Sequence, residues 1–178
     1  YLYTIGGQLV RQLTSGEYEV ADYYGVDATG KNFYYASNEG SPLEKYIYKV
    51  DASGKKTKLS TEKGYNEAVF SNGCQYYLNT YSNLTTPPVY TLCNAAGKTL
   101  QTVEDNGQLK EMLAALPLGT PEIISVNTAD GIQLNGWMVK PKNFDASKKY
   151  PVLMYQYGGP GYQMVFNSFD NGFMGGLI

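Results

Sequence analysis

The residues of this chain whose types and spacing could serve chemistry lie in one stretch near its end, residues 148–163, which reads KKYPVLMYQYGGPGYQ. Its apolar run VLM, residues 152–154, predicts a strand buried on both faces, as in an α/β sheet. The strand leads into the glycine-rich loop 158–161, and ligands of α/β sheets bind beyond the carboxyl ends of the strands. We therefore expect residues 151–157 to form a strand that carries one wall of an active site.

The groups that such a loop would work with are missing from the printed sequence. It contains no histidine and no G-x-S-x-G nucleophile elbow, so a Ser-His-Asp triad cannot be assembled from it. The glycine-rich loop lacks the Lys and Ser/Thr that follow in a phosphate-binding loop. The cysteines Cys74 and Cys93, without histidine, do not have the spacing of a zinc site. We expect no cofactor and no metal, and we expect this chain alone to be catalytically inactive.

Composition and charge describe an ordinary globular chain. Of its 178 residues, 43% are hydrophobic and 17% are charged, which is typical of a packed domain rather than of disorder. A net charge of −2 does not favour binding to nucleic acid or to an anionic membrane. No apolar run reaches the length of a membrane span. We therefore expect no nucleic-acid partner and no membrane contact from this stretch, while the cysteines leave the compartment open.

The first hundred residues contain a repeat. Tyr3, Tyr48 and Tyr90, which are 45 and 42 residues apart, each stand in a strand that is followed by a glycine-bearing turn and a second strand. A different hairpin, residues 24–39, lies between two of these units and is echoed by residues 68–82. One unit is thus four short strands in about 40–45 residues, the spacing of a β-propeller blade. An antiparallel sandwich with evenly spaced hairpins is the alternative.

Turn chemistry supports these hairpins. Asp27 to Gly30, Asp51 to Gly54 and Asn94 to Gly97 each begin with a polar residue and end with a glycine that tolerates positive φ. A hairpin of residues 76–81 with residues 88–92 would place Cys74 opposite residue 94 or 95. A disulfide with Cys93 is then geometrically feasible, although a register slip of one residue would point the two side chains to opposite faces.

The pattern changes at Asp105. Leucines and a methionine at helical spacing predict a short amphipathic helix near residues 107–115, with Asp105 as its cap and Pro117 as its end. Two strands should follow at 122–127 and 132–140, in one sheet with 151–157. The helix either packs between two bodies or is a plain surface helix.

This order of parts resembles the prolyl oligopeptidase family of serine peptidases, and within it the dipeptidyl peptidase IV enzymes. The motifs that carry the resemblance are GWMVKP at residues 136–141 and YPVLMYQYGGPG at 150–161. Upstream segments also match, at residues 10–20, 34–42 and 87–113. The likeness covers nearly the whole chain, and its specificity comes from many weak motifs in the right order.

The resemblance implies a mostly β fold: the last blades of a β-propeller at residues 1–104, a linker helix at 105–119, and the start of an α/β-hydrolase domain at 120–178. It implies a serine exopeptidase that releases N-terminal dipeptides after Pro or Ala, with peptides as its substrates. The triad, and the glutamates that hold the substrate amine, are expected outside this chain. A tripeptidyl peptidase of the same family and a catalytically dead homologue that binds proteins stay open as alternatives. Family habit also implies an extracytoplasmic location and allows a homodimer.

The resemblance assigns a role to one residue of this chain. In the family, the tyrosine that opens the loop after this strand donates its hydroxyl to the oxyanion of the tetrahedral intermediate, and the matching position is Tyr157. Without the family pattern, a tyrosine at the end of an apolar strand is more often a core aromatic. Tyr155 lies on the same strand face and is interpreted as packing.

Overall fold

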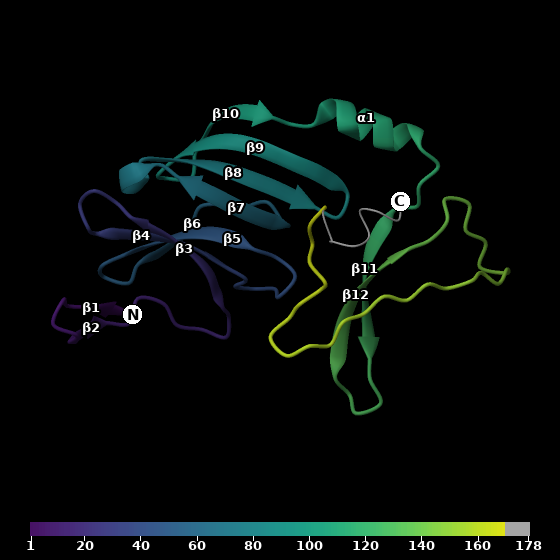
Figure 1. The fold of residues 1–178 in the computed structure, drawn as a ribbon, viewed down its shortest axis with the longest axis horizontal. Helices are drawn as coiled ribbons and strands as arrows, with labels where there is room; N and C mark the ends of the chain where they lie inside the picture. Colours follow the sequence, from purple (N-terminus) through teal and green to yellow (C-terminus); the bar gives the residue numbers. More distant parts are fainter. Residues whose placement is uncertain (170–178) are drawn as a thin grey trace.

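The structure is a computed structural model that describes residues 1–169 (Figure 1). Its main part is a pair of four-stranded antiparallel sheets. A two-stranded ribbon, β1 (Leu2–Tyr3) with β2 (Leu9–Arg11), precedes them. The helix α1 (Gly107–Ala115) and a second ribbon, β11 (Pro121–Asn127) with β12 (Gln133–Val139), follow them.

Each four-stranded sheet takes its strands in chain order, which is the arrangement of a propeller blade. The first sheet contains β3 (Val20–Val26), β4 (Asn32–Ser37), β5 (Tyr46–Asp51) and β6 (Lys56–Lys58). The second contains β7 (Tyr65–Phe70), β8 (Tyr76–Asn83), β9 (Thr86–Asn94) and β10 (Thr99–Glu104). The predicted class, a mostly β fold built from blades, is confirmed.

The tyrosine repeat marks equivalent strands. Tyr48 lies on β5 and Tyr90 on β9, and each of these strands is the third of its sheet. Tyr3 lies on β1, which pairs with β2 and not with the sheet of Tyr48. The β1–β2 ribbon therefore corresponds to the third and fourth strands of a preceding blade.

The two central strands of the first sheet, β4 and β5, are buried on both faces. Tyr34 of β4 and Ile47 of β5 pack with residues of the second sheet in one core cluster. Their neighbours Tyr35 and Tyr48 belong to a second cluster on the opposite face, where their rings stack with centroids 5.5 Å apart. Because side chains alternate between the faces of a strand, a sheet with apolar residues at successive positions needs a neighbour on each side, as a blade in a propeller has.

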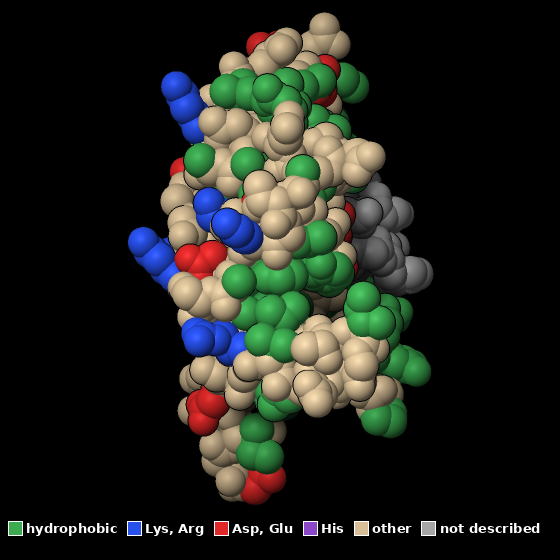
Figure 2. All heavy atoms as spheres, turned by 90° about the vertical axis from the view of Figure 1, so that its left-hand side faces the viewer, with side chains coloured by type: hydrophobic (Ala, Val, Ile, Leu, Met, Phe, Trp, Pro, Cys, Tyr) green, Lys and Arg blue, Asp and Glu red, His purple; other side chains and the backbone are tan. Residues whose placement is uncertain are grey.

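Some apolar side chains have no such cover. Ile5, Leu9 and Val10 of the first ribbon are exposed. The side of the molecule that carries this ribbon shows a broken band of hydrophobic side chains with lysines and arginines along one edge (Figure 2).

The three predicted turns form as the sequence indicates, each closing a hairpin. The Asp27 carboxylate accepts hydrogen bonds from the backbone N–H groups of Lys31 and Asn32. The corresponding side chains, Asp51 and Asn94, make the same kind of turn in their own hairpins. In all three the glycine has positive φ, between 71° and 89°.

The two cysteines are buried but not bonded. The β8–β9 hairpin has the expected centre, with Asn83 opposite Thr86. Its register places Cys93 opposite Tyr77, while Cys74 lies outside the ladder in the short 3₁₀ turn η1 (Asn72–Cys74). The expected position of Cys74 in the ladder, opposite residue 94 or 95, is therefore wrong, because the chain turns before β8 begins. Both cysteines nevertheless lie in one core cluster.

The helix after the blades has the expected length and a different cap. Its N-cap is Asn106, in a left-handed conformation, and no side chain caps it. Asp105 instead accepts a hydrogen bond from the N–H of Gly107 at 2.9 Å. No residue of α1 is buried, which favours a surface helix in this structure. Within residues 1–169, no helix is both long enough and apolar enough to cross a membrane.

The expected strand at residues 151–157 does not form. This segment has no regular secondary structure, and Val152, Leu153 and Met154 are 88%, 77% and 81% exposed. A strand buried on both faces needs a neighbouring strand and covering layers, and residues 1–169 place neither beside it: β11 pairs with β12 alone. The proposed division at residues 104 and 119 into propeller, linker and hydrolase start stays a prediction.

Candidate active-site loop

Tyr157 stands at the start of a tight, glycine-bearing turn. Its side chain is 59% exposed, so it does not fill the core. The Tyr162 ring meets it edge-on, with centroids 5.0 Å apart and planes 84° to each other. The N–H of Tyr162 donates to the carbonyl of Gly159 at 3.3 Å, which closes the turn, and Gly161 has a φ of 72° that favours glycine.

Gly159 makes room for the Tyr157 ring. A Cβ at this position would lie 2.6 Å from both Cε1 and the hydroxyl oxygen of Tyr157. A Cβ at the neighbouring Gly158 would meet only Gln156, at an ordinary 3.7 Å. The sequence Tyr-Gly-Gly thus sets where the phenol can lie, and the second glycine is the one that the ring requires.

The connections between strands lie at the two ends of the blades, and the segment that carries Tyr157 is attached to one of these ends. The strands are antiparallel, so the β3–β4, β5–β6, β7–β8 and β9–β10 turns lie at one end of the blades, and the β4–β5 and β8–β9 loops at the other. The chain leaves β10 at this second end, where the side-chain amide of Asn106 donates to the carbonyl of Pro88 at 2.7 Å. We call it the loop end.

The segment after the turn, residues 163–169, returns to the loop end, and we call it the strap. The N–H of Asn167 donates to the Leu43 carbonyl at 2.7 Å in the β4–β5 loop. The Asn167 side-chain oxygen accepts from the N–H of Leu84, in the β8–β9 loop, at 3.2 Å. The Gln163 amide donates to the Pro42 carbonyl at 2.6 Å. The strap therefore joins both blades to the segment that carries Tyr157.

A buried lysine fixes the junction between the blades. The Lys45 ammonium lies 3.0 Å from a carboxylate oxygen of Asp22 on β3 and 3.0 Å from one of Glu67 on β7. It also lies over the ring of Tyr65, 4.5 Å from the centroid. Burial lowers the pKa of Lys45, but the hydrogen bonds to the two carboxylates outweigh this effect, and the net pKa is raised. The lysine stays charged and holds the two sheets together.

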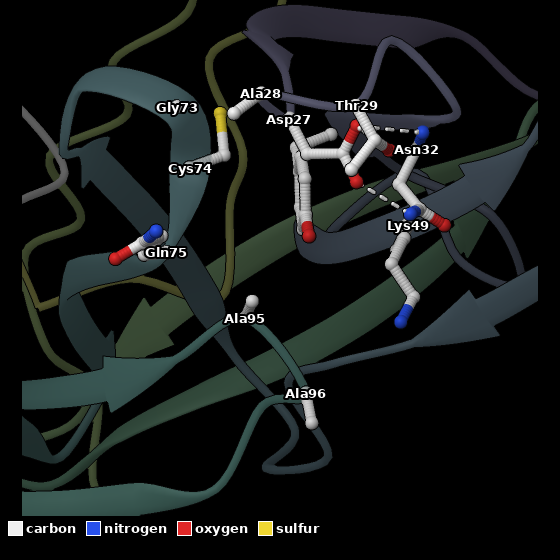
Figure 3. Close-up of a pocket in the computed structure, with 11 residues that line it drawn as sticks. Asp27, Ala28, Thr29, Asn32, Lys49, Gly73, Cys74, Gln75, Ala95 and Ala96 are labelled. Carbon is white, nitrogen blue, oxygen red and sulfur yellow. Dashed lines mark hydrogen bonds between the residues drawn. The ribbon is translucent and has the colours of Figure 1, made fainter.

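A pocket lies at the opposite end of the blades. About 310 Å³ in volume, it is bounded by the β3–β4 turn, by η1 with Cys74, and by Ala95 and Ala96 of the β9–β10 turn (Figure 3). Asp27, its acidic group, is bonded to Thr29 and Asn32, and these bonds hold the pKa of its carboxyl well below the usual range. This carboxylate is engaged in its own turn, so Asp27 is not a free general base.

No group of metal-ligating side chains occurs within residues 1–169. The sequence singled out Tyr157 but gave no sign of Gln163 and Asn167, because a polar residue in a loop carries no periodicity. Only their contacts with Pro42, Leu43 and Leu84, far away in sequence, mark them as part of the site.

Strands grouped in fours, in chain order within each sheet, define this chain as part of a β-propeller protein. Residues 1–88 match the family described as the dipeptidyl peptidase IV (DPP IV) N-terminal region. The part of the chain that this match covers therefore belongs to the dipeptidyl peptidase IV family.

Relatives named as dipeptidyl peptidases align with most of the chain. A probable dipeptidyl-aminopeptidase B of Aspergillus fumigatus is 36% identical over 164 residues, which are 88% of this chain and 18% of that protein. Human dipeptidyl peptidase 8 is 33% identical over 169 residues, 88% of this chain and 19% of that one. The chain thus spans about a fifth of the length of these relatives.

A solved structure carries the same fold. The crystal structure of Porphyromonas gingivalis dipeptidyl peptidase 4 matches with a TM-score of 0.89 and 44% sequence identity, over 94% of this chain and 24% of that one. A putative dipeptidyl aminopeptidase IV from Bacteroides ovatus matches with a TM-score of 0.77 and 26% identity, over 91% of this chain and 23% of that one.

Proposed function

We propose that the intact protein of which this chain is part is a serine exopeptidase that releases dipeptides from peptide N termini, after Pro or Ala. The observation that carries the proposal is the placement of Tyr157: an exposed phenol, set by Gly159 and Tyr162, on a segment strapped to the loop end of the blades. The names of the relatives support the same reaction.

In this proposal Tyr157 acts on the transition state. Negative charge develops on the carbonyl oxygen of the scissile bond only when the tetrahedral intermediate forms. A neutral hydroxyl held at that position by packing stabilises this charge without reorganising during the reaction. The Tyr157 side chain is 59% exposed, which leaves its hydroxyl accessible to a substrate. The nucleophile, its base and the site for the substrate amine are assigned to residues outside this chain.

Chromogenic peptides of different length test the substrate class. The intact protein should cleave Gly-Pro-p-nitroanilide and should not cleave the same substrate with its amine acetylated, because an exopeptidase of this kind recognises the free N terminus. Preference for a tripeptide anilide over the dipeptide would instead indicate a tripeptidyl peptidase. No turnover of either, from protein that is folded, would favour a catalytically dead binding protein and overturn the proposal.

Location and assembly are proposed from the family resemblance. We propose an extracytoplasmic enzyme with peptide substrates that can form a homodimer. Cell fractionation with a cytoplasmic marker tests the location, and light scattering of the intact protein tests the dimer. Recovery with the cytoplasmic marker, or a monomeric mass, would contradict the corresponding half of the proposal.

A further inference from the structure

We propose that Asn167 is a positioning residue: by holding the β4–β5 and β8–β9 loops together with the strap, it fixes the Tyr157 hydroxyl for oxyanion binding. The inference rests on the proposed function of Tyr157. Asn167 itself is ten positions further along the chain, and it acts through the segment between them.

The first step of the argument is that Asn167 contacts both blades at once. Its N–H donates to Leu43 in one blade, and its side-chain oxygen accepts from Leu84 in the next. Phe169 adds a contact of its N–H with the Ser82 hydroxyl at 3.3 Å, on the second blade. When the acceptor of a half-buried hydrogen bond is removed, the donor is left unpaired and bears the cost of its desolvation. Loss of the Asn167 side chain would leave the Leu84 N–H without this partner.

The second step is that the anchors are rigid. In the β8–β9 loop the Asn83 side chain accepts hydrogen bonds from the N–H groups of Thr85 and Thr86, so the loop is fixed around Leu84. In the β4–β5 loop the N–H of Leu43 donates to the Ser41 hydroxyl at 3.2 Å. That loop ends at Lys45, which is held by its two carboxylates.

The third step is that the strap is seated by packing as well as by hydrogen bonds. The Phe166 ring meets Tyr65 edge-on, with centroids 5.3 Å apart, and the Lys45 ammonium lies over the same Tyr65 ring. Phe166 therefore rests on the buried junction between the blades. Aromatic pairs of this geometry favour one arrangement over others.

The fourth step is that little slack separates the strap from Tyr157. Residues 159–162 form the hydrogen-bonded turn, and the Tyr162 ring contacts Tyr157 directly. From Tyr162, only Gln163 to Phe166 intervene before Asn167, and the Gln163 amide is already bonded to Pro42 and Val165. A shift of the strap would therefore move the phenol, and a misplacement of about 1 Å at a catalytic group can cost about 10²-fold in rate.

A double-mutant cycle on the intact protein tests the proposal. Asn167→Ala should lower kcat by about 10- to 100-fold with a smaller change in KM. In a Tyr157→Phe background the same substitution should change kcat by less than about 2-fold, because the group that it positions has no hydroxyl left. If the losses in kcat multiply instead, Asn167 does not act through Tyr157 and the proposal is overturned.

Two further variants separate positioning from a general effect on folding. Asn167→Asp keeps the side-chain oxygen that accepts from Leu84, so it should retain near-normal kcat. Asn143→Ala removes an exposed asparagine that makes no side-chain hydrogen bond within residues 1–169, and it should behave as wild type. Loss of kcat in Asn167→Asp equal to that in Asn167→Ala would contradict the assigned hydrogen bond.

A crystal structure of the intact Asn167→Ala protein reads the placement of Tyr157 without relying on catalysis. A displaced Tyr157 ring supports the positioning role of Asn167 even if Tyr157→Phe leaves kcat unchanged. In that case only the oxyanion role of Tyr157 fails. An unmoved ring overturns the positioning role whatever the kinetics of Tyr157→Phe.

Discussion

At the scale of single residues, the spacing around Tyr157 decides what its side chain can do. Two glycines follow it, and they are not equivalent. Only at Gly159 would a Cβ collide with the phenol, at 2.6 Å, whereas at Gly158 the contact is an ordinary one. Neither glycine has a positive φ, so both positions accept an alanine backbone. An alanine at Gly159 therefore tests the packing of the Tyr157 ring, and an alanine at Gly158 is the matched control.

Gly159→Ala should displace the Tyr157 ring and lower kcat by about 10- to 100-fold, because the hydroxyl leaves the place where the oxyanion forms. Gly158→Ala should stay within about 3-fold of wild type. Steady-state kinetics of the intact protein with a dipeptide anilide, together with melting temperatures, provide the measurement. Equal effects of the two substitutions would contradict the assigned packing of the ring.

Asp51 allows a prediction about pH. The Ser53 hydroxyl and the N–H groups of Lys55 and Ser53 bind its ionised form, which lowers the pKa of its carboxyl. Because the folded pKa lies below the unfolded value of about 3.9, the stabilisation is present above that value and is lost as pH falls through the folded pKa. Asn94 makes the same turn without a charge.

Asp51→Asn should therefore keep the turn and lose only the pH-dependent stabilisation that the ionised carboxylate contributes. The gap in melting temperature between wild type and Asp51→Asn should be largest near pH 7 and should shrink below about pH 4. Thermal unfolding followed by circular dichroism from pH 7 to pH 2.5 checks this expectation. A gap that does not change with pH would mean that the Asp51 charge contributes nothing to the turn.

At the scale of elements, local signals predicted local structure. Each unit of the tyrosine repeat is one hairpin, and each of the three turns that begin with Asp or Asn closes one hairpin. Tyr48 and Tyr90 both lie on the third strand of their sheet. The strand expected at residues 151–157 did not form, because a central strand depends on neighbouring strands that sequence periodicity cannot provide. The expected position of Cys74 in the ladder was wrong because the chain turns at η1, before β8 begins. The strap could not be predicted, since its contacts are long-range and aperiodic.

The contact between blades also depends on one residue. The Lys45 side chain is 8% exposed, while its partners Asp22 and Glu67 are 43% and 60% exposed. Lys45→Met keeps the apolar stem and removes the charge, so the two carboxylates lose their shared cation. Water screens them in part, and we expect the free energy of unfolding to fall by about 1–2 kcal/mol.

Urea unfolding of the intact protein measures this change. Lys49→Met, on β5 four residues after Lys45, is a matched control because Lys49 makes no ion pair within residues 1–169. It should change the free energy of unfolding by less than about 0.5 kcal/mol. A loss for Lys49→Met as large as that for Lys45→Met would show that strand packing, and not the charge, is responsible.

At the scale of the whole molecule, the loop end of the blades meets the segment that carries the candidate oxyanion donor (Figure 1). The sequence contains no histidine, so these 178 residues cannot supply the base of a triad. We expect the purified 178-residue polypeptide to hydrolyse Gly-Pro-p-nitroanilide no faster than buffer does. Turnover with triad-like kinetics from that polypeptide would show that its chemistry has been misassigned.

The central claim is that Tyr157 stabilises the oxyanion, and Tyr157→Phe in the intact protein tests it most directly. The substitution keeps the ring and its contact with Tyr162 but removes the hydroxyl. The account predicts a fall in kcat of about 10²- to 10³-fold, with KM changed far less and the melting temperature preserved, because the hydrogen bond forms mainly in the transition state. A variant that keeps a near-normal kcat would contradict the catalytic role of Tyr157.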